Sequence, residues 1–199
     1  MDWFKWHTRY EASPLLQARL TLVRAQIAQA IQACPHASIR LISLCAGDGR
    51  DVIGTLVNHP RRDHTSAYLI ESHPALVAHG EGAIAQGDLR TRVQFLQADA
   101  TLSTTYQAIA PADVLVVCGV FGNVHEADTG QMIEHLRGLC RRQGRVVWTR
   151  TVAHPRDQRA TALIREQFCA AEFTKSWCST PRRRASWSRR TPLAVIRPR

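Results

Sequence analysis

Short apolar runs alternate with segments of helical character along most of this sequence of 199 residues. Short strands that alternate with helices are typical of a parallel sheet covered by helices on both faces. The five runs are Ile39–Leu44, Ala67–Ile70, Val93–Leu96, Val114–Val117 and Arg145–Trp148. The sequence therefore predicts a doubly wound α/β fold, in which the carboxyl ends of the parallel strands share one edge.

The segments between the runs predict the helices that cover this sheet. Proline and glycine mark some of their ends, and the expected helices are Val52–Val57, Pro74–Gly87, Leu102–Ile109, Ala127–Cys140 and Arg156–Ala170. Two late strands, Phe173–Cys178 and Leu193–Arg197, are expected after the last helix.

An amphipathic helix is also expected before the first strand. Ser13 and Pro14 suit the N-cap and the first helical position. Apolar residues then recur at helical spacing, at Leu16, Leu20, Val23, Ile27 and Ile31. Because a chain of this length most simply forms one domain, we expect residues 1–36 to form an N-terminal cap and helix on a Rossmann-like core, 37–199.

The positive charge is concentrated in the last residues. The formal net charge is +10, but residues 175–199 hold 8 of the 26 Lys and Arg and none of the 16 acids. The stretch PRRRASWSRR, residues 181–190, could bind phosphates or be a solvated loop. Six cysteines without CxxC spacing indicate a reduced protein with no metal site. With no long apolar run and no secretory signal, we expect a cytoplasmic protein that does not enter a membrane.

Several strand ends carry residues suited to a ligand. The first strand leads into LISLCAGDGRDV, residues 41–52, where glycines allow close approach of a ligand to the backbone. Glu71 ends the second strand, where its carboxylate could accept hydrogen bonds from ribose hydroxyls, and Asp99 ends the third, where it could accept from an adenine amino group. Cys118 and Gly119 end the fourth. Because parallel strands share one edge at their carboxyl ends, we expect these residues to form one site.

The pattern favours a nucleoside ligand without phosphates. Val52 stands where the GxGxxG fingerprint of dinucleotide-binding proteins needs its third glycine, and the phosphate loop GxxxxGK[ST] is absent. S-adenosylmethionine fits this pattern, because its amino-acid end needs bare backbone while its sugar and base need the acids.

From about Trp3 to Cys178 the chain resembles class I S-adenosylmethionine-dependent methyltransferases. Their first motif, acid-x-Gly-x-Gly-x-Gly, falls on residues 43–49, with Ser43 in place of the acid and Cys45 in place of the first glycine. Residues 112–121 resemble the fourth motif. The segments SLCAGDGRD, CGVFGN and WTR, and the WHxxY start at Trp6, are similar to a bacterial subfamily described only as methyltransferases.

The resemblance implies a seven-stranded sheet, mostly parallel, whose last two strands form an antiparallel hairpin with the Arg-rich stretch as its loop. It also implies S-adenosylmethionine as the cofactor. The residues expected to bind this cofactor are Ser43, Cys45, Ala46, Gly47, Gly49, Glu71, Ser72, Asp99, Ala100, Cys118 and Gly119.

The substrate-side residues are less constrained. Methyl transfer needs mainly proximity and exclusion of water, and a general base only for some acceptors. Candidate bases are His125, Tyr10 and His7, while Asn123 and Arg150 are candidate contacts to the acceptor. Alternatively, His125 lies on the surface and Arg150 pairs with Asp157. Residues 3–10 form either a lid or an anchor for the helix that follows.

A small-molecule methyltransferase is the favoured interpretation, and two alternatives stay open. An RNA or protein methyltransferase could dock through the basic C-terminal segment. A non-catalytic domain could keep the S-adenosylmethionine pocket for regulation or partner binding. A nicotinamide-dependent enzyme fits least, because the third glycine is missing.

Overall fold

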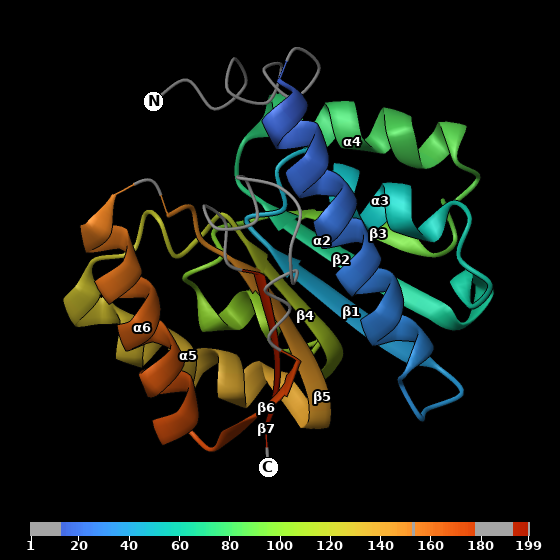
Figure 1. Ribbon diagram of the computed structural model, residues 1–199. Coiled ribbons are helices and arrows are strands. Elements are labelled where there is room, and N and C mark those ends of the chain that lie inside the picture. The colour runs from blue at the N-terminus through green and yellow to red at the C-terminus, as the bar shows by residue number, and fades with distance from the viewer. Residues whose placement is uncertain (1–12, 153, 178–192, 199) are drawn as a thin grey trace.

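The computed structural model describes residues 13–152, 154–177 and 193–198. In this part of the chain a seven-stranded sheet has the order β3-β2-β1-β4-β5-β7-β6 (Figure 1). The strands are β1 (Ile39–Leu44), β2 (Thr65–Glu71), β3 (Val93–Gln97), β4 (Ala112–Cys118), β5 (Cys140–Thr149), β6 (Phe173–Trp177) and β7 (Leu193–Pro198). The α-helices are α2 (Pro14–Gln32), α3 (Arg50–Leu56), α4 (Pro74–Gln86), α5 (Thr129–Leu139) and α6 (Pro155–Ala170). Three 3-10 turns are η1 (Arg62–His64), η2 (Ser103–Tyr106) and η3 (Glu126–Asp128).

Strands β1 to β5 are parallel. β1 pairs with β2 and β4, β2 pairs with β3, and β4 pairs with β5, so the carboxyl ends of all five strands lie at one edge. β7 runs antiparallel to both β5 and β6. The predicted α/β Rossmann-like class is confirmed. The Arg-rich stretch 181–190, expected between the last two strands, lies outside the described residues.

The sheet is covered on both faces, with α2, α3 and α4 on one face and α5 and α6 on the other (Figure 1). Alternate residues of one strand enter different cores: Val114 and Val116 of β4 pack with the first group of helices, and Leu115 and Val117 with the second. All four side chains are fully buried. Burial on both faces is the reason why the central strands read as continuous apolar runs.

Helix α2 begins as its sequence predicts, because Ser13 Oγ accepts a hydrogen bond of 3.4 Å from Leu16 N and Pro14 occupies the first turn. Its apolar stripe has two parts. Val23, Ile27, Ala30 and Ile31 are buried against the sheet and α3, whereas Leu16 and Leu20 are only partly buried and line a cavity. None of the described helices is long and apolar enough to span a membrane.

Two expected helices differ in detail. The segment expected as a helix over residues 102–109 forms only the 3-10 turn η2, where the hydroxyl of Tyr106 donates a hydrogen bond of 2.6 Å to Ala100 O. The helix expected from residue 127 is divided into η3 and α5. The first difference changes the type of the whole segment, whereas the second lies at the start of a helix, where boundaries commonly vary by one or two residues.

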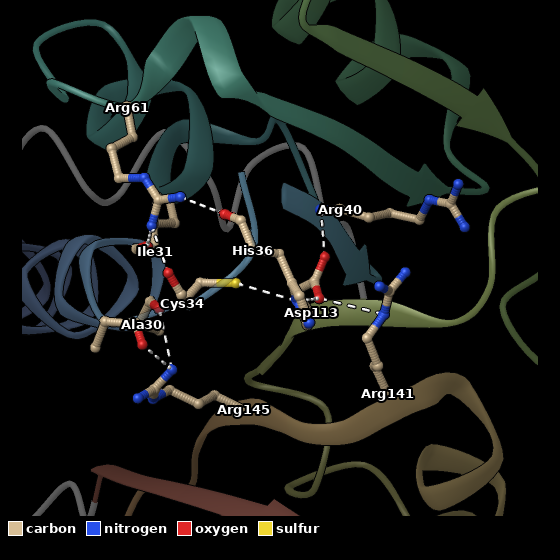
Figure 2. A network of polar contacts seen from close by, with 10 residues as sticks. Ala30, Ile31, Cys34, His36, Arg40, Arg61, Asp113, Arg141 and Arg145 are labelled. Atoms are coloured by element: carbon tan, nitrogen blue, oxygen red, sulfur yellow. Dashed lines mark hydrogen bonds and ion pairs between the residues drawn. The ribbon is translucent and has the colours of Figure 1, made fainter. Parts of the chain in front are cut away.

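A polar network ties α2 to the sheet at the edge opposite the strands' carboxyl ends (Figure 2). The buried Asp113 carboxylate contacts His36 Nδ1 at 2.7 Å through Oδ1 and accepts from Arg40 N at 2.8 Å through Oδ2. Arg141 Nε lies 3.3 Å from Oδ1 of the same carboxylate. Nearby, Arg61 Nη1 donates to Cys34 O at 2.7 Å. Asp113 lies in the first residues of β4, a central strand. The network therefore holds the segment between α2 and β1 against the centre of the sheet.

Candidate cofactor site

A cavity of about 780 Å³ opens at the edge of the sheet where the parallel strands end. Its walls come from the first turns of α2, the turn between β1 and α3, the end of β2, and the segments after β4 and β5. This is the position at which ligands bind in open α/β sheets. The volume lies within the range of small-molecule sites.

Most of the residues predicted to bind a cofactor lie in the wall of this cavity: Ser43, Cys45, Ala46, Gly47, Glu71, Ser72, Cys118 and Gly119. Asn123, predicted to contact the acceptor, also lines it. Gly49, Asp99 and Ala100 are not among the lining residues. The sequence therefore located the cavity correctly, while the binding role of each residue stays a prediction.

The turn after β1 has an unusual backbone. Cys45, Gly47 and Gly49 have φ values of 49°, 61° and 69°, in the left-handed region that favours glycine. The turn is anchored by a hydrogen bond of 2.9 Å from Ala46 N to Ile70 O. Cys45 adopts this left-handed conformation although it is not a glycine.

Glu71 joins the end of β2 to this turn, although its side chain is only 9% exposed. Its Oε2 accepts a hydrogen bond of 2.9 Å from Gly47 N, and its Oε1 accepts one of 2.9 Å from His73 N. A carboxylate oxygen has two lone pairs, so Glu71 retains acceptor capacity toward the cavity. The sequence predicted that Glu71 contacts a ligand. It did not predict the hydrogen bond from Gly47 N to Glu71, which depends on the pairing of β1 with β2.

His73 is a lining residue that the sequence did not single out. Its Nδ1 is buried and has no hydrogen-bond partner among the described residues. It follows Glu71 and Ser72 at the start of α4. Since this atom has almost no exposed surface, it is other atoms of His73 that line the cavity.

Asp99 is not among the residues that line the cavity, although its charge acts on Cys45, which does line it. Its carboxylate accepts hydrogen bonds of 2.8 Å from both the backbone N and the hydroxyl of Thr101. These bonds hold the pKa of the fully exposed Asp99 carboxyl below its usual range. β3 is the edge strand of the sheet, two strands from β1. The contact of Asp99 with an adenine stays a prediction.

Thr149, the last residue of β5, forms hydrogen bonds with residues of the cavity wall beside the end of β4. Thr149 Oγ1 accepts hydrogen bonds of 3.0 Å from Gly119 N and 2.7 Å from Arg19 Nη2. Asn123 Nδ2 donates to Gly119 O at 3.1 Å and so holds the loop that follows. Gly119 has a φ of 84°, which favours glycine here.

Two cysteine thiols in the wall are protonated at neutral pH. Desolvation, together with the nearby Glu71 carboxylate, raises the pKa of Cys45 to about 11. Burial raises the pKa of Cys118 to about 12. Since the thiolate is the nucleophilic form, neither side chain is activated as a nucleophile.

Four charged residues in the wall, Arg19, Asp48, Arg50 and Asp51, were not predicted as site residues. Arg19 comes from α2, and Asp51 comes from the first turn of α3. Neither lies at the end of a strand, which is where the sequence pattern directs attention. The signal for Arg19 was a charge between Leu16 and Leu20 in the apolar stripe.

Two remaining candidates that the structure describes, His125 and Arg150, do not line the cavity. His125 is exposed at the start of η3 and does not line it. Arg150 Nη1 donates to Phe121 O and fixes the loop after β4. Asp157, the alternative partner of Arg150, accepts a hydrogen bond of 2.8 Å from His154 N at the start of α6. His7 and Tyr10 lie outside the described residues.

Metal-ligating side chains meet at the opposite edge of the sheet. Among the described residues, one group, Cys34, His36 and Asp113, has its donor atoms within 4.8 Å of one another. Asp113 already contacts His36, Arg40 N and Arg141 there (Figure 2). These contacts give the cluster a structural role, because they connect the segment after α2 with β1 and β4 at the edge opposite the cavity.

Comparison with known proteins defines the class of this fold and then the family. The fold is that of class I methyltransferases. The structure of magnesium protoporphyrin IX methyltransferase from Synechocystis PCC 6803, with bound SAM, superposes with a TM-score of 0.68 at 14% identity. The match covers 91% of this chain and 80% of that chain. A carbon methyltransferase, CurJ, gives a TM-score of 0.75 at 17% identity and covers 98% of this chain but 58% of its own. The [4+2]-cyclase SpnF gives 0.67 at 14% identity, covering 92% and 82%.

The sequence itself matches the family described as "Putative methyltransferase" over residues 16–184. The chain belongs to this family. No curated protein matches it.

Proposed function

We propose that this protein is an S-adenosylmethionine-dependent methyltransferase that acts on a small-molecule acceptor. One observation carries the proposal: Glu71 and the glycine turn lie in the same cavity, joined by the hydrogen bond from Gly47 N to Glu71 Oε2. A bare backbone turn and an acid one strand away are the two features that the nucleoside and the amino-acid end of this cofactor require. Membership of a methyltransferase family supports the same reaction class.

The residues present fit the cofactor. Glu71 is suited to accept hydrogen bonds from the ribose hydroxyls, and Ser72 and His73 line the cavity beside it. The turn at residues 45–47 can lie against the amino-acid end, and Cys118 and Gly119 form the wall between the two. When bound, this cofactor supplies a methyl group activated by a positively charged sulfur.

The protein's contribution to transfer would be proximity and the exclusion of water. Leu16, Leu20, Val120 and Val124 give the cavity apolar walls. The protonated thiols of Cys45 and Cys118 would not compete with the acceptor for the methyl group, because their pKa values of about 11 and about 12 keep them neutral.

The acceptor would lie in the part of the cavity next to Asn123. Asn123 lines the cavity and is proposed to contact the acceptor. His125, Tyr10 and His7 remain candidate bases for acceptors that need deprotonation. Free thiols at Cys34, Cys45, Cys118, Cys140 and Cys169 fit a reducing compartment, in keeping with the cytoplasmic site of action that we propose.

Two alternative functions are tested by the turnover experiment described below. Docking of RNA or protein through residues 181–190 concerns a segment outside the described residues. A non-methylating role is suggested by SpnF, a [4+2]-cyclase with a similar fold, since fold alone does not define a reaction.

The test is turnover with S-adenosylmethionine labelled at its methyl group. The acceptors are a panel of phenols, carboxylic acids, amines and thiols, with total RNA and a protein extract as separate arms. We expect label in at least one small molecule, with an equal amount of S-adenosylhomocysteine. Label only in RNA or protein would overturn the small-molecule assignment, and no transfer to any acceptor would overturn the enzymatic one.

A further inference from the structure

Arginines gather at the edge of the sheet where the parallel strands begin, opposite the cavity. They lie in the segments that lead into β2 and β3, in β1 and in the first part of β5: Arg40, Arg61, Arg62, Arg90, Arg92, Arg141, Arg142 and Arg145. The segments at this edge, residues 36–40, 61–64, 88–92, 110–113 and 140–145, also contain three acids, Asp63, Asp88 and Asp113. We call these segments the arginine edge. With eight arginines against three acids, it carries a positive charge.

Contacts between neighbouring segments make this row continuous. Arg62 Nη2 donates a hydrogen bond of 3.0 Å to Asp88 O and so joins the start of β2 to the segment before β3. Arg40 Nη1 donates one of 3.1 Å to Ala110 O, between β1 and the segment before β4. Figure 2 shows the central part of the edge, around Asp113. Since neighbouring strands lie about 4.8 Å apart, the row from β3 to β5 is on the order of 19 Å long.

Several of these arginines have a structural role. Arg61 Nη1 donates to Cys34 O at 2.7 Å, and Arg145 Nη1 donates to Ala33 O at 3.1 Å, both at the carboxyl end of α2. Cations are favourable at this end of a helix, where carbonyl groups lack intrahelical partners. Because the acceptors are uncharged, these hydrogen bonds leave the positive charge of the edge in place.

The two ends of the row are not explained by such contacts. Arg90 and Arg92 precede β3, and Arg142 lies near the start of β5. Arg90 and Arg142 are exposed, and Arg92 is partly exposed. Within the described part of the chain, the side chains of these three arginines form no hydrogen bond or ion pair. Their guanidinium groups therefore present donors to solvent, in the fork geometry that matches phosphate.

The composition of this edge favours a polyanion over a membrane or a protein. Among the described residues, the large apolar side chains that are exposed are Leu15 and Leu102, in the first turn of α2 and after β3. Both positions lie toward the opposite edge of the sheet. Membrane surfaces and protein interfaces are normally contacted by apolar side chains as well as by charged ones. A row of this length also exceeds a single small anion and fits a chain of phosphates instead.

We propose that the arginine edge binds the phosphate backbone of single-stranded RNA without regard to base sequence. This inference goes beyond the proposed function and does not depend on it, because the RNA would be held opposite the cavity and is not the methyl acceptor. One row of guanidinium groups offers a narrow track, which suits one strand better than a duplex. Guanidinium planes can also stack on unpaired bases. In the cytoplasm, the location proposed above, single-stranded nucleic acid is chiefly RNA.

The experiment measures binding of a fluorescently labelled single-stranded RNA of about 12 nucleotides by anisotropy, with the full chain. The edge variant combines Arg90→Gln with Arg142→Gln, which removes one charge from each end of the row. The matched control combines Arg156→Gln with Arg159→Gln, at two exposed positions near the start of α6, which follows the carboxyl end of β5. A matched control is necessary because residues 175–199 are also basic and attract RNA by charge alone.

At about 50 mM salt we expect the edge variant to bind RNA about tenfold more weakly than the wild-type protein, and the control to stay within about twofold of it. The slope of log Kd against the logarithm of the salt concentration should fall by about 1.4 for the edge variant, since each phosphate contact on a single strand contributes about 0.7. The melting temperature and S-adenosylhomocysteine binding should be unchanged in both variants, because all four side chains are exposed and lie outside the cavity.

Equal affinities of the edge variant and the control for RNA would assign binding to overall charge and overturn the proposal, as would absence of RNA binding by the wild-type protein. Parallel titrations use single-stranded DNA, polyglutamate and vesicles of phosphatidylcholine with phosphatidylserine. Equal or tighter binding of any of these ligands would overturn the choice of RNA. A lower melting temperature of the edge variant would assign Arg90 and Arg142 a structural role instead. Failure of the wild-type protein to bind S-adenosylhomocysteine would concern the proposed function alone.

Discussion

Replacing Glu71 with glutamine is expected to weaken S-adenosylmethionine binding by about tenfold or more, which corresponds to about 1.4 kcal/mol. Both carboxylate oxygens accept hydrogen bonds from backbone N–H groups, those of Gly47 and His73. An amide has only one oxygen, so its NH₂ group must face one of these donors. The variant would also lose the charge that strengthens hydrogen bonds from ribose hydroxyls.

The measurement is calorimetric titration of Glu71→Gln and Glu71→Ala beside the wild-type protein. Glu81→Gln is the matched control, since Glu81 is an exposed acid on the neighbouring helix α4. Circular dichroism should show that each variant retains its helices and strands. Wild-type affinity in a folded Glu71→Ala protein would mean that this carboxylate does not contact the cofactor.

Replacing Gly49 with alanine is expected to destabilise the fold by about 2–4 kcal/mol. Gly49 has a φ of 69°, and a Cβ there would lie 2.6 Å from Leu69 Cδ1 and 3.0 Å from Ile53 Cδ1. The left-handed backbone and the crowding would each contribute to the loss. Gly49 does not line the cavity, so its role is to let α3 begin directly behind the turn.

Urea denaturation of Gly49→Ala and Gly82→Ala measures this effect. A Cβ at Gly82, on α4, meets nothing within 4 Å, so this control should be unchanged or more stable by up to about 1 kcal/mol. Equal free energies of unfolding for Gly49→Ala and the wild-type protein would contradict the geometry of the turn.

The sequence was most informative where one physical requirement acts on a continuous segment. The central strands are buried on both faces, so their apolar runs locate them well, as Ile39–Leu44 shows, whereas β5 begins at Cys140, before its predicted run. The parallel arrangement then brings the ends of β1, β2 and β4 to one edge. That step alone predicted that Glu71 and the glycine turn share a site.

The sequence was less informative where position depends on the order of strands or on a helix face. Asp99 follows a strand as Glu71 does, but β3 lies at the edge of the sheet and Asp99 is not among the residues that line the cavity. Arg19 was not identified, because a single arginine within an apolar stripe has no periodic pattern of its own. Its guanidinium donates a hydrogen bond to Thr149, which lies 130 residues away in the sequence.

Titration of the wild-type protein with S-adenosylmethionine and S-adenosylhomocysteine tests the central claim most directly. The cavity at the carboxyl edge, the glycine turn and Glu71 predict that both ligands bind, with dissociation constants on the order of micromolar, about −8 kcal/mol. Failure of both to bind at millimolar concentration, in a protein shown to be folded, would contradict the assignment of this cavity as the cofactor site.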